Sequence, residues 1–341
     1  AKACEGALPR YRRPNALEEN IEVFFVAIVI ALGIRAYFLQ PFRIPTGSMR
    51  PTLNGIIGHK LAKEKFPAFP VKAWQAVAGG RKYIYEPLSS EQKRYILPHP
   101  TRRDPQGAPI PWIEQRQKWQ FFTETTIHFE DGAVVKLKAP RSALENMGAL
   151  DKEHLKHNMD GSRWWLIPNT IASGYTTSGD LVLVDKVSYN FRRPRRGEVF
   201  VFDTRSIKGI QERSDNPQGA GSHYIKRLVG EPGDEMEIRV PDSIFTNGTD
   251  LRDGTPGILY RNGKPIEGVE AFRLNRERAE ALAKNPDAPN TTNYPSYRAG
   301  GLLSNKSPLR IPGKTDVDNP TGQNFYFAMG DNSPNSLDGR A

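Results

Sequence analysis

Cysteine is nearly absent from this chain of 341 residues, with Cys4 as the single example. One cysteine cannot form an intramolecular disulfide, and it excludes a cysteine-based zinc site. Histidine is also scarce, with six residues, and none lies in a serine hydrolase motif such as G-x-S-x-G. His154 and His157 are spaced for one face of a helix, but no third ligand accompanies them. We therefore expect no metal and no cofactor.

Acidic residues are fewer than basic ones, 38 against 48, which gives a net charge of +10. Such an excess is compatible with an anionic membrane surface or with nucleic acid. The basic residues are scattered, however, and the densest clusters lie at 10–13 and 192–196. Neither cluster is interleaved with aromatic residues in a nucleic-acid-binding module. We expect no nucleic-acid partner and interpret the charge as solvated or membrane-facing.

Long apolar runs are missing, because the longest uninterrupted one covers only 12 residues, Val23 to Ile34. Alone it is too short to cross about 30 Å of hydrocarbon. Extension to Ile21 and Leu39 gives 19 residues, with Glu22 and Arg35 near its ends. Both charged side chains can reach the interface from there.

We predict a retained transmembrane anchor over residues 18–40, preceded by a cytoplasmic tail, 1–17. Two alternatives stay open: a cleavable signal peptide that ends at Ala31-Leu32-Gly33, and a buried helix of a soluble domain. Basic residues before the span favour an N-terminus inside the cell. Further basic residues follow the span and weaken this charge asymmetry: Arg43, Arg50 and Lys60.

Beyond the anchor, the pattern predicts a mainly β chain. A core would be assembled from 41–54, 173–240 and 322–341, and two large insertions, 55–172 and 241–321, would interrupt it. Within these segments we expect a hairpin around Asp131-Gly132, strands over 179–203, 223–240 and 324–329, and helices over Ser142–His157 and Arg273–Lys284.

Ser48 follows Gly47 on a turn just past the apolar segment, where its hydroxyl would be accessible. A nucleophilic serine needs a base, and the histidines offer none. Lys226 is the other candidate, because strand alternation places it on one face with Tyr224 and Leu228. Burial would lower its pKa from about 10.4 toward neutrality. Taken singly, each residue is better explained by the simpler alternative, an ordinary turn serine for Ser48 and a solvent-reaching strand lysine for Lys226.

Together, four segments resemble the motif boxes of the type I signal peptidases, in the family's order and after a single hydrophobic segment. They read PTGSMRPTL, GDLVLVDKVSYNF, YIKRLVGEPGDEMEI and GDNSPNSLDGR. The resemblance implies a signal-peptidase-like β core with an N-terminal transmembrane helix. It also implies a membrane-bound serine endopeptidase that removes signal peptides from exported preproteins after small-x-small sites.

The resemblance implies a role for each matching residue. Ser48 would be the nucleophile and Lys226 its general base, Ser336 would hydrogen-bond and orient the lysine, and the Thr46 hydroxyl would join the Ser48 N–H in an oxyanion hole. Apolar substrate pockets would be lined by Ile44, Met49, Leu53, Tyr224 and Ile225, of which Met49 and the strand residues could equally be plain core. Structural ion pairs would involve Arg227, Asp331, Asp338 and Arg340.

The last box departs from the family's common GDNRDNSxDSR pattern. Ser333-Pro334 and Gly339 are atypical, and this puts the ion-pair scaffold in question. The first insertion also separates the first two boxes much further than usual, and we assign it no role.

The resemblance places the chain in a bacterial inner (plasma) membrane as a single-pass protein with its catalytic domain on the outer side. Its partners would be preprotein signal peptides and the lipid bilayer; the sequence does not indicate an oligomeric state. One rival interpretation is a self-cleaving repressor with the same Ser–Lys chemistry, which the apolar segment and the lack of a DNA-binding region disfavour. Another is a catalytically inactive, membrane-tethered binding module on a peptidase scaffold.

Overall fold

The structure is a computed structural model. It describes residues 15–87, 95–103, 109–118, 122–148, 155–157, 164–166, 170–204, 207, 223–242, 254–303, 308–317 and 319–340. Two compact units divide the chain: Ala1–Pro41 with Leu183–Arg193, and Phe42–Val182 with Pro194–Ala341. The basic cluster at 10–13, most of the predicted tail, and His154 lie outside the described residues.

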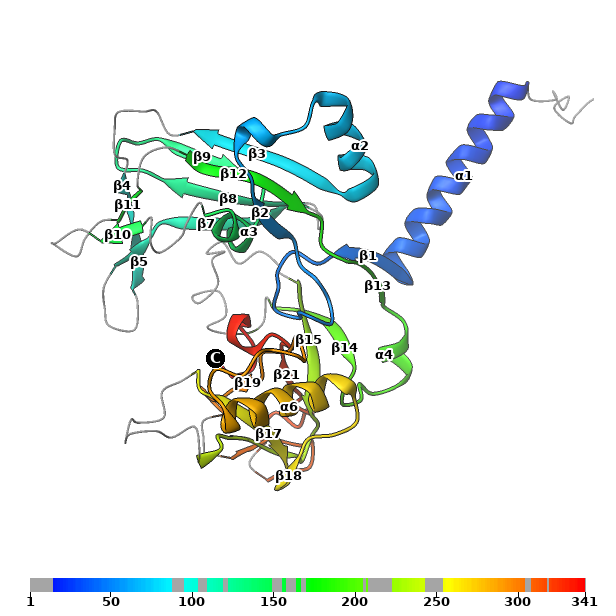
Figure 1. Ribbon diagram of the computed structural model, residues 1–341. Coiled ribbons are helices and arrows are strands. Elements are labelled where there is room, and N and C mark those ends of the chain that lie inside the picture. The colour runs from blue at the N-terminus through cyan, green and yellow to red at the C-terminus, as the bar shows by residue number, and fades with distance from the viewer. Residues whose placement is uncertain are drawn as a thin grey trace, which may run out of the picture. The chain divides into compact units, whose positions relative to one another are not determined.

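Helix α1, Ala16–Tyr37, dominates the first unit (Figure 1). Asn15 and Glu18 form a capping box that fixes its start: the Asn15 side chain accepts from the Glu18 N–H, and the Glu18 carboxylate accepts from the Asn15 N–H. The helix buries none of its residues, and Phe24 and Phe25 are 67% and 66% exposed. Among the helices of the described ranges, none combines the length and the apolar content needed to cross a membrane.

The segment after β13 differs from the prediction. β13, Leu181–Asp185, pairs with β1, Leu39–Arg43, as a strand. The chain then forms the short helix α4, Ser188–Phe191, where we expected extended structure. The Asp185 carboxylate explains the change, because it accepts hydrogen bonds from the N–H groups of Val187 and Ser188 and so starts a helical turn.

The second unit holds the remaining sheets, so the prediction of a mainly β chain is confirmed. Within the first insertion, the predicted hairpin is present as β8 and β9. The predicted helix is only α3, Arg141–Asn146: Gly148 lies at φ +80° just beyond it, and Leu155–His157 is a strand. The strands of this region are β2 Ile57–Lys60, β3 Arg81–Pro87, β4 Tyr95–Ile96, β5 Pro98–Arg103, β6 Pro109–Pro111, β7 Ile113–Lys118, β8 Phe122–His128, β9 Val134–Leu137, β10 Leu155–His157, β11 Trp164–Leu166 and β12 Thr170–Thr177.

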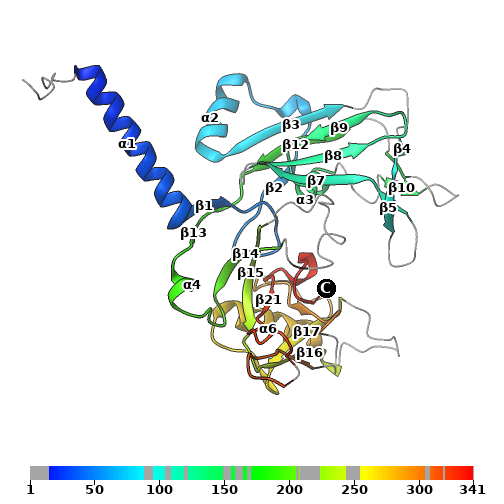
Figure 2. The ribbon, with the colours of Figure 1, turned by 180° about the vertical axis from the view of Figure 1, so that it is seen from behind.

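The first insertion has its own hydrophobic core. Ile127 and Phe129 are buried at its centre, and Leu144 of α3 packs into the same cluster. Three of its sheets have three strands each, in the orders β2-β12-β3, β7-β8-β9 and β10-β11-β4. Helix α2, Phe69–Gly79, follows the 3-10 turn η1, Lys63–Lys65, and lies along β3 in both ribbon views (Figures 1 and 2).

The sheet that carries the candidate site has the strand order β14-β15-β21 and is antiparallel throughout. A second sheet, β18-β17-β16-β20, has α6 packed on β17. The predicted strand–turn–strand over 223–240 and the predicted helix at 273–284 are both present. The bounds are β14 Val199–Asp203, β15 His223–Gly230, β16 Glu235–Arg239, β17 Pro256–Arg261, β18 Lys264–Pro265, α6 Glu270–Lys284, β19 Tyr297–Arg298, β20 Leu309–Arg310, β21 Phe327–Met329 and the 3-10 turn η3 Ser333–Asn335.

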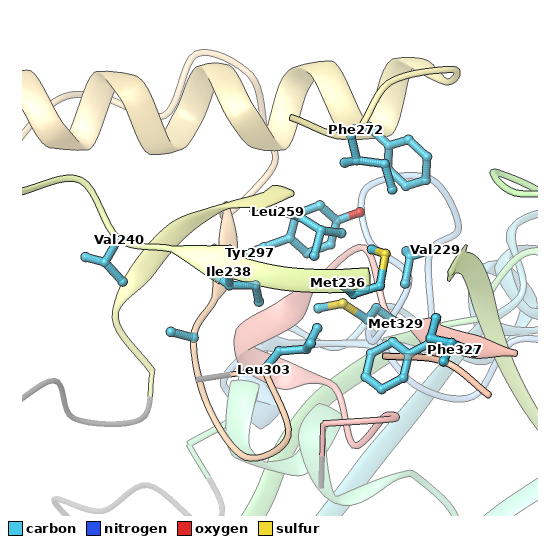
Figure 3. Close-up of a cluster of buried hydrophobic side chains, with 13 residues drawn as sticks. Val229, Met236, Ile238, Val240, Leu259, Phe272, Tyr297, Leu303, Phe327 and Met329 are labelled. Carbon is cyan, nitrogen blue, oxygen red and sulfur yellow. The ribbon is translucent and has the colours of Figure 1, made fainter. Parts of the chain in front are cut away.

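A second hydrophobic cluster joins these two sheets (Figure 3). Val229 from β15 and Met329 from β21 lie in one cluster with Met236 from β16 and Phe272 from α6. Tyr297 is fully enclosed in the same cluster. The segment that we predicted as a second insertion therefore shares one core with the strands that carry the site.

Candidate active site

The segment with Ser48 forms a tight turn after β1, and the end of the chain fixes its conformation. The Asn332 N–H donates to the Ser48 carbonyl at 3.0 Å, and the Asn332 side-chain amide donates to the Gly47 carbonyl at 2.9 Å. The Arg50 N–H closes the turn onto Gly47 at 3.1 Å. Ser48 is only 5% exposed as a result.

Lys226 reaches this serine from the middle of β15. Its Nζ lies 2.9 Å from Ser48 Oγ and 3.2 Å from the Ile225 carbonyl oxygen. Like Ser48, it is buried, with 4% of its surface exposed. The structure thus brings together two side chains that are 178 positions apart, on the face that strand alternation indicated.

Burial lowers the pKa of Lys226 to about 8, chiefly because the charged amine loses its hydration. Asp338 raises the pKa, and Arg340 lowers it again. Asp331 also raises the pKa, but both carboxylates are paired with arginines and burial outweighs them. At neutral pH a substantial fraction of Lys226 is therefore uncharged and can accept a proton.

Thr46 also lies near the Ser48 hydroxyl. Its Oγ1 is 3.5 Å from Ser48 Oγ, which is at the outer limit of a hydrogen bond. Its hydroxyl is therefore close enough to the nucleophile oxygen to contact an oxygen that develops on a carbonyl carbon attached there.

Ser336 lies at the site but does not make the contact that the resemblance implies. Its Oγ is buried and makes no hydrogen bond among the described residues, so it does not bond Lys226. The Lys226 amine contacts Ser48 Oγ and the Ile225 carbonyl oxygen. Ser336 instead packs against Gly330, where an added Cβ would lie 2.2 Å from Ser336 Oγ and 2.5 Å from the Ser48 carbonyl oxygen.

Arg227, next to the lysine on β15, forms a buried bidentate pair with Asp331. Its Nε and Nη2 lie 2.8 and 2.6 Å from the two carboxylate oxygens, and Nη1 donates to the Gly197 carbonyl at 2.7 Å. Thr52 Oγ1 also donates to Asp331, at 2.5 Å, and contacts the Tyr294 hydroxyl at 2.9 Å. This network connects the nucleophile segment, β15 and the end of the chain.

The second pair, Arg340 and Asp338, supports the turn behind the site. Nε and Nη2 of Arg340 lie 2.8 and 3.0 Å from the carboxylate oxygens. Asp338 also accepts from the Gly330 N–H at 3.2 Å. Arg340 additionally donates to the carbonyls of Arg298 and Ser333, both at 2.8 Å. All four charged residues that we predicted as structural ion pairs are thus paired.

Two of the three atypical residues of the last box, Ser333 and Gly339, have structural explanations. Ser333 is buried, and its hydroxyl accepts from the Arg298 N–H at 2.9 Å, which fastens β19 to this turn. Gly339 packs closely against Phe327, and an added Cβ would lie 3.0 Å from that ring. A large charged residue in place of Ser333 would separate the two segments.

The residues predicted to line apolar pockets divide into two groups. Ile44 and Met49 are buried, at 2% and 0% exposure, whereas Leu53, Tyr224 and Ile225 are half-exposed. A separate polar cavity of about 450 Å³ adjoins Thr46 and Gly47. None of the five predicted pocket residues is among the described residues that line this cavity.

Sequence reasoning missed Thr52, Tyr294 and Asn332. Thr52 and Asn332 lie inside the quoted motifs, but only their side-chain contacts indicate a role. Tyr294 lies 242 positions from Thr52 in a polar stretch with no local signal. For metals, the described part of the chain holds no group of three or more His, Cys, Asp or Glu side chains that could bind an ion.

Comparison with known proteins gives a consistent result. Residues 17–73 and 165–341 match the family described as signal peptidase, peptidase S26. Signal peptidase I P of Bacillus subtilis subsp. natto is 26% identical over 51% of this chain and 69% of its own length. A probable signal peptidase I-1 of Synechocystis is 27% identical over 47% of this chain and 52% of its own length. Signal peptidase I of Rickettsia canadensis is 31% identical over 43% of this chain and 44% of its own length.

The family match covers more than half of the chain, so the chain belongs to the S26 family of signal peptidases. The aligned regions span between 44% and 69% of these relatives' lengths. No solved structure matches the chain.

Proposed function

We propose that this protein is a serine endopeptidase that removes signal peptides from exported preproteins, with Ser48 as nucleophile and Lys226 as general base. The observation that carries the proposal is the 2.9 Å contact between Lys226 Nζ and Ser48 Oγ, with both groups buried. A serine needs an adjacent base to become nucleophilic. An amine with a pKa of about 8 suits that task near neutral pH.

In the first half of the cycle, Ser48 Oγ attacks the scissile carbonyl carbon while its proton moves to Lys226 Nζ. The carbonyl oxygen becomes an oxyanion, and the Ser48 N–H and the Thr46 hydroxyl stabilise it. Collapse of this intermediate breaks the C–N bond. The proton then passes from Lys226 to the amine of the departing mature protein, and an ester on Ser48 remains.

In the second half, a water molecule attacks the ester carbonyl and gives a proton to neutral Lys226. Collapse releases the carboxylate end of the signal peptide and returns the proton to Ser48. Lys226 is neutral at the start of each half-reaction. Its burial therefore serves both steps, since a charged ammonium could accept no proton.

We further propose that Leu53, Tyr224 and Ile225 contact substrate side chains over a floor formed by the buried Ile44 and Met49. Such a shallow apolar surface favours small residues at the two substrate positions that face it, as in small-x-small cleavage sites. Met49 is fully buried, which supports a role beneath the pocket.

We propose that α1 attaches the chain to a bacterial plasma membrane, with the N-terminus inside and the catalytic unit outside. The support is the exposure of its apolar side chains, such as Val23 at 67% and Phe24 at 67%, which water solvates poorly. The signal peptides of exported proteins reach the same membrane, so the attachment would bring enzyme and substrate together.

The test is cleavage of a preprotein with an Ala-x-Ala site by purified full-length protein, followed by electrophoresis and N-terminal sequencing. We expect cleavage after the second alanine by the wild type and none by Ser48→Ala or Lys226→Ala. Thr123→Ala, which removes another buried hydroxyl far along the chain from Ser48, serves as a control and should cleave. Full activity in Ser48→Ala would overturn the assignment. Circular dichroism checks that each variant is folded, and Ser48→Cys would replace Ser48→Ala if the alanine variant does not fold.

A further inference from the structure

Helix α2 presents its apolar side chains to the outside of the protein. Phe69, Trp74 and Val77 are 82%, 70% and 86% exposed. At 3.6 residues per turn they fall within an arc of about 140°, the width of an ordinary core-facing stripe. We call these three residues the outer face of α2.

The opposite side of α2 is polar, and it is this side that packs on the protein. Lys72 Nζ lies 5.2 and 5.7 Å from the ring centroids of Phe66 and Tyr83. The Tyr83 hydroxyl donates to the Gln75 side chain at 2.6 Å. An amphipathic helix normally buries its apolar side, so this inverted arrangement leaves the outer face without a partner in the described chain.

The surroundings of α2 are strongly basic. Residues 63–82 contain five Lys or Arg residues and one acidic residue, Glu64. Several of these cations lie over aromatic rings: Lys63 Nζ is 4.3 Å from the Tyr85 ring, and the Arg81 guanidinium is 5.1 Å from the Tyr175 ring. Cation–π contacts leave the positive charge in place. Lys63 and Lys65, just before α2 in the chain, are exposed, and we call these two residues the basic border of α2.

We propose that α2 docks on the surface of an anionic phospholipid bilayer, with its outer face inserted among the acyl chains and its basic border against the headgroups. A tryptophan beside aliphatic residues and a basic border is the composition of interfacial helices. A second copy of the chain fits less well, because two such faces would oppose like charges. Trp74 and Val77 lie outside the residues matched to the family, whereas Phe69 lies within them.

The inference extends the membrane attachment proposed for α1, and its test measures the lipid contact of α2 separately from that of α1. In full-length protein with Cys4→Ser, a single cysteine replaces Trp74 or Val77 and carries an environment-sensitive fluorophore. Val317→Cys, at a fully exposed valine, is the matched control. Each protein is incorporated into phosphatidylcholine vesicles with or without phosphatidylglycerol, and flotation confirms incorporation.

We expect doxyl-labelled lipids to quench the probes at 74 and 77 about twofold in vesicles that contain phosphatidylglycerol, and the probe at 317 hardly at all. Lys63→Gln with Lys65→Gln should weaken the dependence on phosphatidylglycerol. Probes at 74 and 77 that stay unquenched in floated protein would overturn the proposal. So would a blue shift that appears without lipid and grows with protein concentration, because that result identifies a second copy as the partner. Peptidase activity, measured separately, does not enter either readout.

Discussion

The depressed pKa of Lys226 makes a quantitative prediction for the pH dependence of cleavage. With a pKa of about 8, about a tenth of the amine is neutral at pH 7 and about a hundredth at pH 6. For a lysine with an unperturbed pKa, the neutral fraction at pH 7 would be about 300 times smaller. We therefore expect kcat/KM to rise about tenfold per pH unit below pH 7, to bend near pH 8 and to be flat above pH 9.

The assay is a fluorogenic peptide without titratable side chains, cleaved by the full-length protein between pH 6 and pH 10. Asp338 raises the pKa of Lys226, so Asp338→Asn should move the midpoint to lower pH. Glu277→Gln, an exposed change on α6, should leave it in place. A midpoint at or above about pH 10, or a rate that does not change between pH 6 and pH 9, would refute the idea that burial supplies the neutral base.

Three further predictions concern stability, each measured by chemical denaturation of full-length protein in micelles. Lys226→Met should raise the unfolding free energy at pH 7 by up to ~3 kcal/mol, because the folded-state pKa lies below the unfolded value of 10.5. The unfolding free energy of the wild type should rise by that difference between pH 8 and pH 10.5. An equal rise in Lys226→Met would contradict the argument from burial. Asp331→Asn should cost about 3–5 kcal/mol by leaving Arg227 buried without its partner, and Asp316→Asn at the surface should cost little. Tyr294→Phe should cost about 1 kcal/mol by removing the bond to Thr52. Tyr297→Phe should be neutral or stabilising, because the Tyr297 hydroxyl has no hydrogen-bond partner among the residues that the structure describes. A larger loss of unfolding free energy in Tyr297→Phe than in Tyr294→Phe would contradict the Thr52 network.

Local patterns predicted much of the fold. Alternating apolar residues around Asp131-Gly132 indicated the β8–β9 hairpin, and the turn glycine there does adopt φ +79°. The position of Lys226 between Tyr224 and Leu228 left a buried lysine open beside a solvent-reaching one, and the structure has the lysine buried. Each of these signals lies within a few residues of the feature that it predicts.

Features that depend on distant contacts or on single side chains could not be predicted in the same way. Helix α4 forms because one carboxylate, Asp185, captures two backbone N–H groups. The helix expected up to His157 ends at Asn146, shortly before Gly148 with its φ of +80°. The contact of Tyr294 with Thr52 depends on how two remote segments fold together. Ser336 makes no hydrogen bond to Lys226 and packs against Gly330, a contact that no motif specifies.

The most direct test of the central claim is to locate the covalent adduct that an acylating serine probe forms. Full-length wild type, Ser48→Ala and Lys226→Met would be treated at pH 6 and pH 9, digested and mapped by mass spectrometry. We predict an adduct on Ser48 in the wild type, more at pH 9 than at pH 6, and none on either variant. Equal labelling of Ser48 in Lys226→Met and the wild type would contradict the role of the buried amine.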